Sequence, residues 1–123
     1  MPLVTIEVDE TVPEAKIQAW ADAINTGMAE GLDIDPADRF QVIHTLPKNH
    51  IIADPHFLGG DRRAVVYIRI QMVHLYDAAT KNRMYDAIAR RLEAEGVRPD
   101  DVFIAVNEVA LDDWYPGARG KRG

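Results

Sequence analysis

Two five-residue stretches set the organisation of this chain: Pro36-Ala37-Asp38-Arg39-Phe40 and Pro99-Asp100-Asp101-Val102-Phe103. Both carry the pattern Pro-x-Asp-x-Phe, and they lie 63 residues apart in a chain of 123 residues. Further matches at an offset of 65 are Lys16 with Lys81, Trp20 with Tyr85, Glu30 with Glu95 and Gly31 with Gly96. The length is that of one domain, so the sequence predicts a single domain, residues 1–123, with an internal repeat of residues 1–60 and 61–123.

The first copy predicts a strand, a helix and a second strand. Residues 2–8 alternate between apolar and polar side chains and are rich in Val, Ile and Thr, which indicates a strand. Thr11 and Glu14 have the spacing of a helix capping box, and Gly31 is a plausible helix end. The apolar residues of one helical face are Ile17, Trp20, Ala21, Ile24 and Met28. A short strand is expected at about residues 39–44.

The second copy repeats this order after a long loop over residues 46–62, which contains Pro47, Pro55, Gly59 and Gly60. Loops of that length in a small domain are often functional or form interfaces. Residues 64–73 and 102–109 are predicted strands. Between them, Asp77 can cap a helix that Gly96 ends, with apolar positions at Met84, Tyr85, Ile88 and Leu92.

Two strand–helix–strand units predict an α/β (α+β) fold, in which one four-stranded mixed sheet carries both helices on one face. The other face is then uncovered. We expect that Val4, Ile6, Tyr67 and Val73 cannot all be left in water, so the sequence predicts an oligomer.

Composition excludes several classes of function. Hydrophobic residues make up 47% and charged residues 28%, which is typical of a soluble globular protein. The net charge of −6 argues against a nucleic-acid partner, and no apolar run approaches the roughly 20 residues of a membrane span. The N-terminus lacks a secretory pattern, so a cytoplasmic protein is expected. The sequence contains no Cys and no Ser, which removes disulfides, thiolate nucleophiles and serine triads.

No metal or cofactor is expected. Of the four histidines, His44, His50, His56 and His74, the first three are spaced six residues apart, which fits no pair of ligands on one helix. No acidic partner is placed convincingly beside any of the four.

Pro2 is the most distinctive candidate for chemistry. If Met1 is removed, the nitrogen of Pro2 becomes a secondary amine placed directly before a strand. Such an amine can transfer protons or attack a carbonyl group, whereas an amide nitrogen can do neither. A Met-Pro start is common, so Pro2 alone is also compatible with no function at all.

Pro2 before a strand, together with the duplicated unit, resembles the tautomerase superfamily, and more specifically its malonate semialdehyde decarboxylase branch. The matching stretches are residues 38–41, the loop Phe57 to Arg63, the segment Arg98 to Ile104, and Asp113-Trp114. The resemblance implies a homotrimer, a catalytic N-terminal proline at Pro2 and an assisting aspartate at Asp38. The repeat allows another interpretation of Asp38, because Asp101 holds the same place and either residue can cap a turn.

The sequence departs from that branch where the decarboxylases carry a pair of arginines that hold the substrate carboxylate. His74 and Tyr76 stand there, and neither can reproduce a bidentate guanidinium contact. Arg69, Arg62 and Arg63 are alternative cations, although arginines in such positions are more often surface or interface salt-bridge residues. Trp114 matches an aromatic residue of the family's pocket wall, or it packs in the core.

The sequence therefore predicts a tautomerase-superfamily enzyme that transfers a proton on a small enol, a 2-keto acid or a related carbonyl acid, with decarboxylation or hydration also possible. The alternative is a non-catalytic trimeric binding or scaffold protein that kept the fold and lost the arginine pair.

Overall fold

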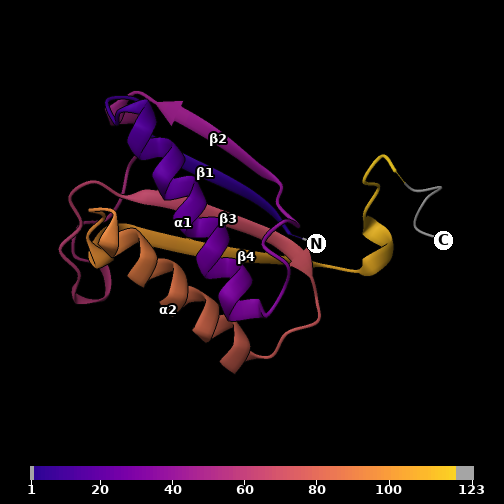
Figure 1. Cartoon of the computed structure of the whole chain (residues 1–123). Helices are drawn as coiled ribbons and strands as arrows, with labels where there is room; N and C mark the ends of the chain where they lie inside the picture. Colours follow the sequence, from indigo (N-terminus) through magenta and orange to yellow (C-terminus); the bar gives the residue numbers. More distant parts are fainter. Residues whose placement is uncertain (1, 119–123) are drawn as a thin grey trace.

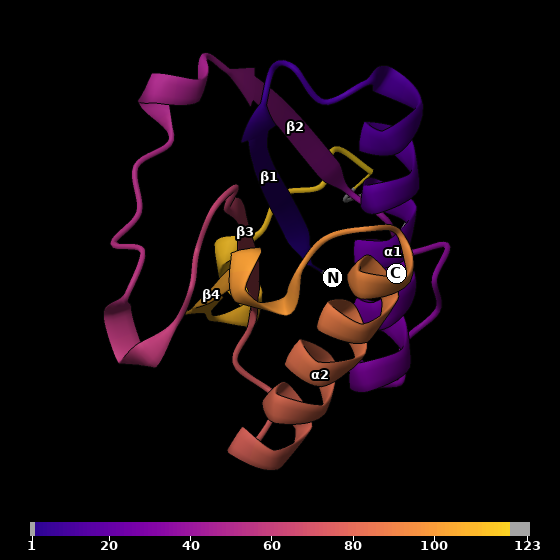
Figure 2. The same cartoon turned by 90° about the vertical axis from the view of Figure 1, so that its left-hand side faces the viewer.

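Four strands form one sheet in the order β2-β1-β3-β4, and two helices cover one of its faces (Figures 1 and 2). The computed structural model describes residues 2–118. The elements in chain order are β1 (Leu3–Asp9), α1 (Glu14–Leu32), β2 (Gln41–Leu46), β3 (Val66–Val73), α2 (Ala78–Ala94) and β4 (Val102–Val109). This arrangement confirms the predicted fold class, a mixed sheet with both helices on one side.

The sheet is built from two parallel pairs joined by an antiparallel one. β1 runs parallel to β2, β3 runs parallel to β4, and β1 pairs antiparallel with β3. At the centre of the antiparallel pair, Ile6 lies opposite Ile68. Each parallel pair is connected through a helix, because parallel neighbours need a crossover connection. The two strand–helix–strand units therefore meet along the seam between β1 and β3.

Alternation along the central strands decides which side chains enter the core. Val4 and Ile6 point toward the helices and are 0% and 2% exposed. Their assignment to an uncovered face was wrong, because the even-numbered residues of β1 face inward and Leu3, Thr5 and Glu7 face outward. Val73 is also buried, whereas Tyr67 does lie on the open face.

Two predicted helix signals in the first copy were also wrong. Thr11 does not cap α1, because its hydroxyl donates to Asp9 Oδ1 at 3.0 Å and Pro13 occupies the cap position. Gly31 does not end the helix, which continues to Leu32 and closes with Asp33 in the left-handed conformation. In the second copy, Asp77 caps α2 as predicted, because its Oδ1 accepts a hydrogen bond from the Thr80 N–H at 2.8 Å.

Gly31 instead allows the two helices to approach closely. A Cβ atom built on Gly31 would lie 2.3 Å from Met84 Cα, and one on Gly27 would lie 2.7 Å from Ile88 Cα. The two glycines are four residues apart and therefore lie on the same face of α1, against the matching face of α2. The missing side chains let backbone pack on backbone at this contact.

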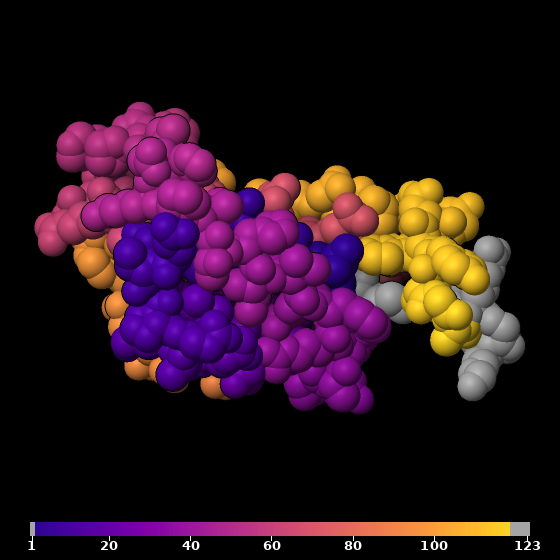
Figure 3. Space-filling view, turned by 90° about the horizontal axis from the view of Figure 1, so that it is seen from above, coloured from indigo at the N-terminus to yellow at the C-terminus, as the bar shows by residue number. Residues whose placement is uncertain are grey.

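Two segments extend away from the rest of the molecule. Residues 47–65 arch away from the sheet and contain the short turns Lys48–His50 and Phe57–Gly59 (Figure 2). Residues 110–118 project beyond the sheet from the end of β4 (Figures 1 and 3). Both segments expose large apolar side chains, namely Ile52, Phe57, Leu58, Leu111 and Tyr115. Over residues 2–118, no helix is both long and apolar enough to cross a membrane.

We predict that Gly31→Ala destabilises the fold by roughly 2–3 kcal/mol, because the added methyl group overlaps the α2 backbone. Helix propensity alone predicts the opposite sign, a gain of about 1 kcal/mol. Urea denaturation measures the change. Thr26→Ala, on the exposed face of α1, is the matched control and should be neutral or slightly stabilising. Equal stabilisation of both variants would contradict the close helix contact.

Candidate active site

Most of the predicted site residues gather at one end of the sheet. We call this the Pro2 end, where β1 and β2 begin and where β3 and β4 finish. Because β1 and β3 are antiparallel, the start of the first unit and the end of a strand of the second unit meet there. Pro2, Asp38, His74 and Glu108 thus come from four separate stretches of the chain.

Pro2 lies immediately before β1, and its ring is almost completely buried. Leu3 pairs with Gln71, so continuation of the register places Pro2 opposite Met72. On the other side, the Val4 N–H donates to Phe40 O at 3.0 Å. The nitrogen of Pro2 is therefore held between the two neighbouring strands. Met1, whose removal the chemistry requires, lies outside the described residues.

Asp38 lies in the turn that leads into β2, because that strand begins at Gln41 rather than at residue 39 as predicted. The turn is fastened to α1 from both sides. Asn25 Nδ2 donates to Pro36 O at 2.9 Å, and Arg39 forms an ion pair with Asp22 at 2.8 Å. Asp38 is half-buried, and its backbone N–H donates to Asp35 O at 3.0 Å. These contacts fix the turn that carries Asp38 at the Pro2 end of the sheet.

Asp101, the counterpart of Asp38 in the repeat, has a structural role. It is 3% exposed, and its Oδ1 accepts from the backbone N–H groups of Arg63 at 2.7 Å and Ala64 at 3.0 Å. Its other oxygen meets Arg98 Nη1 at 3.2 Å. The two aspartates thus hold equivalent positions in the repeat but have different surroundings. Asp101 fixes the loop before β3, and Asp38 borders the Pro2 end.

His74 follows β3 and belongs to a chain of charged groups that sequence reasoning missed. Its Nδ1 lies 2.6 Å from Glu108 Oε2, and Lys81 Nζ lies 2.7 Å from Glu108 Oε1. The hydrogen bond from Lys81, followed by that from His74, holds the pKa of the Glu108 carboxyl below its ordinary value. The same contact with Glu108 raises the pKa of the Lys81 amine. Tyr76 is half-buried and packs against the core.

The three arginines predicted as alternative cations lie away from the Pro2 end of the sheet. Arg69 is on the open face of the sheet, where it pairs with Glu7 at 3.2 Å. Arg63 pairs with Asp61 at 2.7 Å, and Arg62 donates to Phe57 O at 2.7 Å. Both loop arginines precede β3, at the opposite end of the sheet from Pro2. Within one protomer, none of these three residues is at the Pro2 end.

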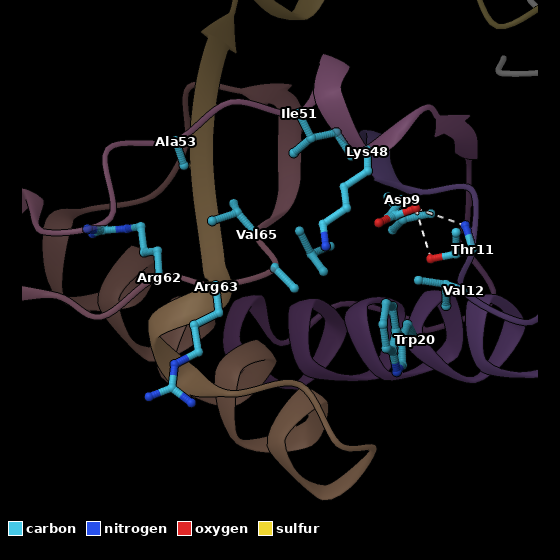
Figure 4. A pocket seen from close by; sticks show the side chains of 13 residues that line it. Asp9, Thr11, Val12, Trp20, Lys48, Ile51, Ala53, Arg62, Arg63 and Val65 are labelled. Atoms are coloured by element: carbon cyan, nitrogen blue, oxygen red, sulfur yellow. Dashed lines mark hydrogen bonds between the residues drawn. The ribbon is translucent and has the colours of Figure 1, made fainter.

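A cavity of about 420 Å³ lies beneath the arching loop at that opposite end (Figure 4). Val8, Val12 and Val65 are among its apolar lining residues, with Trp20 rising from α1. Figure 4 shows the Lys48 ammonium group reaching inward and the Arg63 guanidinium pointing away. Within a single chain, this cavity is separated from Pro2 by the full length of β1.

Trp114 lies in the projecting segment, directly after the turn Leu111–Asp113. It is half-buried, and its indole Nε1 is shielded from solvent without a hydrogen-bond partner in the described part of the chain. The segment leaves from the end of β4, so Trp114 lies beyond the Pro2 end of the sheet. Over residues 2–118, no three His, Asp or Glu side chains gather in a way that could hold a metal ion.

Comparison with known proteins shows the family to which the chain belongs. A model of the tautomerase enzyme family matches residues 38–115, which is more than half of the chain. The chain therefore belongs to the tautomerase family. Probable tautomerase YrdN of Bacillus subtilis (strain 168) is 26% identical over 118 residues, covering 95% of this chain and 92% of the relative.

Solved structures place the chain near malonate semialdehyde decarboxylases. FG41 malonate semialdehyde decarboxylase, inhibited by 3-bromopropiolate, is 34% identical with a TM-score of 0.89, over 94% of this chain and 88% of the other. A second malonate semialdehyde decarboxylase, described with decarboxylase and hydratase activities, is 25% identical with a TM-score of 0.87, over 94% and 90%. These findings confirm the resemblance to the decarboxylase branch.

A more distant structure shares the fold. A fused 4-OT symmetric trimer is 13% identical with a TM-score of 0.78, over 94% of this chain and 92% of the other.

We predict that Asp101→Ala destabilises the fold by about 2–4 kcal/mol, because it leaves two backbone donors without an acceptor. Asp101→Asn keeps one side-chain oxygen and should lose only about 1 kcal/mol. Thermal and urea unfolding of both variants check the order. Asp38→Ala is the repeat-matched comparison, and a loss of stability as large as that of Asp101→Ala would contradict the separate roles.

Proposed function

We propose that this protein is an enzyme in which the amine of Pro2, freed by removal of Met1, transfers a proton on a small enol, a 2-keto acid or a related carbonyl acid. The observation that carries the proposal is the convergence of Pro2, Asp38 and His74 at the Pro2 end of the sheet. The family and its decarboxylase relatives support the same chemistry. Decarboxylation or hydration of a small carbonyl acid uses similar groups and is included in the proposal.

The position of Pro2 suits its amine to proton transfer. A free α-amino group titrates near pH 8 in general, with a pKa of about 7.7–8.0. Apolar burial favours the neutral amine, while a carboxylate nearby favours the ammonium form. Pro2 is buried, and Asp38 borders the same end of the sheet. Apolar burial and a carboxylate can therefore both act on the amine. A rigid strand directly after the amine restricts its motion relative to a bound substrate.

The proposed reaction is a proton shift between oxygen and carbon. The Pro2 ammonium delivers a proton to the carbon atom of an enol, so that its N–H bond breaks and a C–H bond forms from the C=C electron pair. The enol O–H bond breaks as its proton passes to a base or to water, and the oxygen becomes a carbonyl. Asp38 stabilises the ammonium form by its negative charge. Trp114 contributes an apolar wall that excludes water from the carbon atom that accepts the proton.

The substrate is expected to carry less negative charge than those of an enzyme with an arginine pair. His74 and Tyr76 take the place of that pair in the sequence, and Tyr76 can offer one neutral hydrogen bond. Arg69 is occupied with Glu7 on the other face of the sheet. Arg62 and Arg63 lie at the opposite end, so they can reach a Pro2 site only from a neighbouring copy.

We also propose that the working form is a homotrimer. The open face of the sheet presents Leu3, Val42 and Phe103, which are 38%, 45% and 41% exposed. Apolar side chains on both projecting segments add to this uncovered surface. The loop and the C-terminal segment leave the molecule at opposite ends, so contacts between unlike ends can close a ring. The fold relative described as a symmetric trimer supports the same arrangement.

We predict that Pro2→Ala lowers the rate of ketonisation of a simple enol pyruvate by about 100-fold or more, because the secondary amine is replaced by a differently basic primary amine. Intact mass must first show that both proteins have lost Met1. An uncleaved N-terminal extension on the wild-type sequence should be equally inactive, since its proline nitrogen is an amide. Equal rates for wild type and Pro2→Ala would exclude the proline mechanism and leave the scaffold interpretation.

We predict a sedimentation mass three times that of the 13.8 kDa chain. Phe103→Lys on the open face should shift the protein toward monomers, because a charge is costly to bury in an interface. Thr26→Lys, on the solvent face of α1, is the control and should remain trimeric. A wild-type mass of one subunit would contradict the proposed assembly.

A further inference from the structure

His74 is held by a carboxylate in an orientation that leaves one ring nitrogen available. Nδ1 lies 2.6 Å from Glu108 Oε2, while the side chain is 76% exposed to solvent. Glu108 is ionised near neutral pH, because its contacts with Lys81 and His74 lower its pKa. An ionised carboxylate can only accept a hydrogen bond, so Nδ1 must carry a hydrogen. In the neutral ring, Nε2 is then an unprotonated acceptor.

Lys81 fixes the carboxylate from the other side. Its Nζ is 2.7 Å from Glu108 Oε1, so both oxygens of Glu108 are engaged by different partners. Lys81 and Glu108 are both largely shielded, with side chains 23% and 21% exposed. Lys81 comes from the first turn of α2 and Glu108 from the end of β4. Two rigid elements therefore hold the group that orients His74.

The strand register places His74 close to Pro2. Pro2 stands opposite Met72 by continuation of the β1–β3 pairing, and Met72 pairs with Glu108 in β4. His74 lies two residues beyond Met72 on the same side, and its N–H still bonds to Val109 O at 2.9 Å. Strand geometry then separates the Cα atoms of Pro2 and His74 by about 8 Å. Pro2 and His74 are therefore neighbours at the same end of the sheet.

The charges of this group do not make a strong anion clamp. The positive charge of Lys81 is offset by Glu108, and the Glu108 carboxylate repels any anion that approaches His74. The same arrangement favours a base, because Glu108 stabilises the imidazolium that forms when Nε2 accepts a proton. The geometry is that of a base oriented by a third group.

Resting on the proposed function of Pro2, we propose that His74 is the second proton-transfer group of the site, with Glu108 and Lys81 as its positioning residues. In ketonisation, Nε2 of His74 removes the proton from the enol oxygen as the Pro2 ammonium donates its proton to carbon. The O–H and N–H bonds break, a C–H bond forms, and the carbonyl replaces the enol. Neutral Pro2 and the His74 imidazolium remain, and exchange with water restores both.

The first test separates proton transfer from substrate binding. His74→Gln retains an N–H donor for Glu108 but cannot accept and carry a proton. We expect kcat for the enol pyruvate to fall by about 100-fold with KM changed less than about threefold. Unchanged kcat with a raised KM would overturn the proposal and make His74 a binding residue.

The second test addresses the positioning residues. Glu108→Gln should lower kcat by about 10-fold. Lys81→Met should lower kcat by less than that, because Lys81 acts through Glu108. Glu30→Gln, which removes the ion pairs with Arg90 and Arg91 on the outer helix surface, is the matched control and should keep wild-type kcat. Equal losses in all three variants would indicate a general loss of stability and contradict the specific role.

The third test requires no turnover. Long-range ¹H–¹⁵N NMR of histidine-labelled protein reports which ring nitrogen carries the hydrogen. We expect the neutral His74 ring as the Nδ1–H form in the wild type, and a shift toward the Nε2–H form in Glu108→Gln. An Nε2–H ring in the wild type would overturn the proposal, even in a protein whose substrate is unknown. Activity lost in Pro2→Ala but retained in His74→Gln refutes the role of His74 alone, whereas activity retained in both refutes the proposed function.

Discussion

The antiparallel pairing of β1 with β3 is the contact on which the rest of the structure depends. It joins two units whose own strands are parallel, and it buries Ile6 against Ile68 and Val4 against Ile70 at the centre of the sheet. Each unit alone has one helix and two strands, which is too little apolar surface for an independent core. The close contact of α1 and α2 at Gly27 and Gly31 then covers the seam from one side.

The direction of that seam also assembles the candidate site. Because β1 and β3 run in opposite directions, the first residue of β1 meets the last residues of β3. Pro2 thereby lies beside Met72 and two residues from His74, and the parallel neighbour β4 adds Glu108 in the same row. A parallel pairing of β1 and β3 that aligned their first residues would have placed Pro2 beside Val65, at the other end of β3.

Local sequence pattern was sufficient to predict a residue's role wherever that residue acts on its immediate neighbours in the chain. The strand over 102–109 and the Asp77 cap follow from alternation and from a side chain reaching three residues ahead. Gly31 was misassigned because a glycine near a helix end has two uses, and only the position of Met84 on the other helix distinguishes them. Asp38 and Asp101 share a motif, but the role of Asp101 depends on the loop before β3, where the backbone N–H groups of Arg63 and Ala64 donate to its carboxylate.

By itself, the sequence determined the duplicated unit, the layering of helices on one face of a mixed sheet, and the exceptional position of Pro2. These follow from periodicity and from residues close together in the chain. Only the tertiary structure decided that Arg69 pairs with Glu7 on the open face of the sheet, and that Glu108 contacts both His74 and Lys81. His74, Lys81 and Glu108 are separated by up to 34 positions in sequence, and their contacts depend on strand register and helix placement. Such long-range contacts are products of packing, which no local pattern encodes.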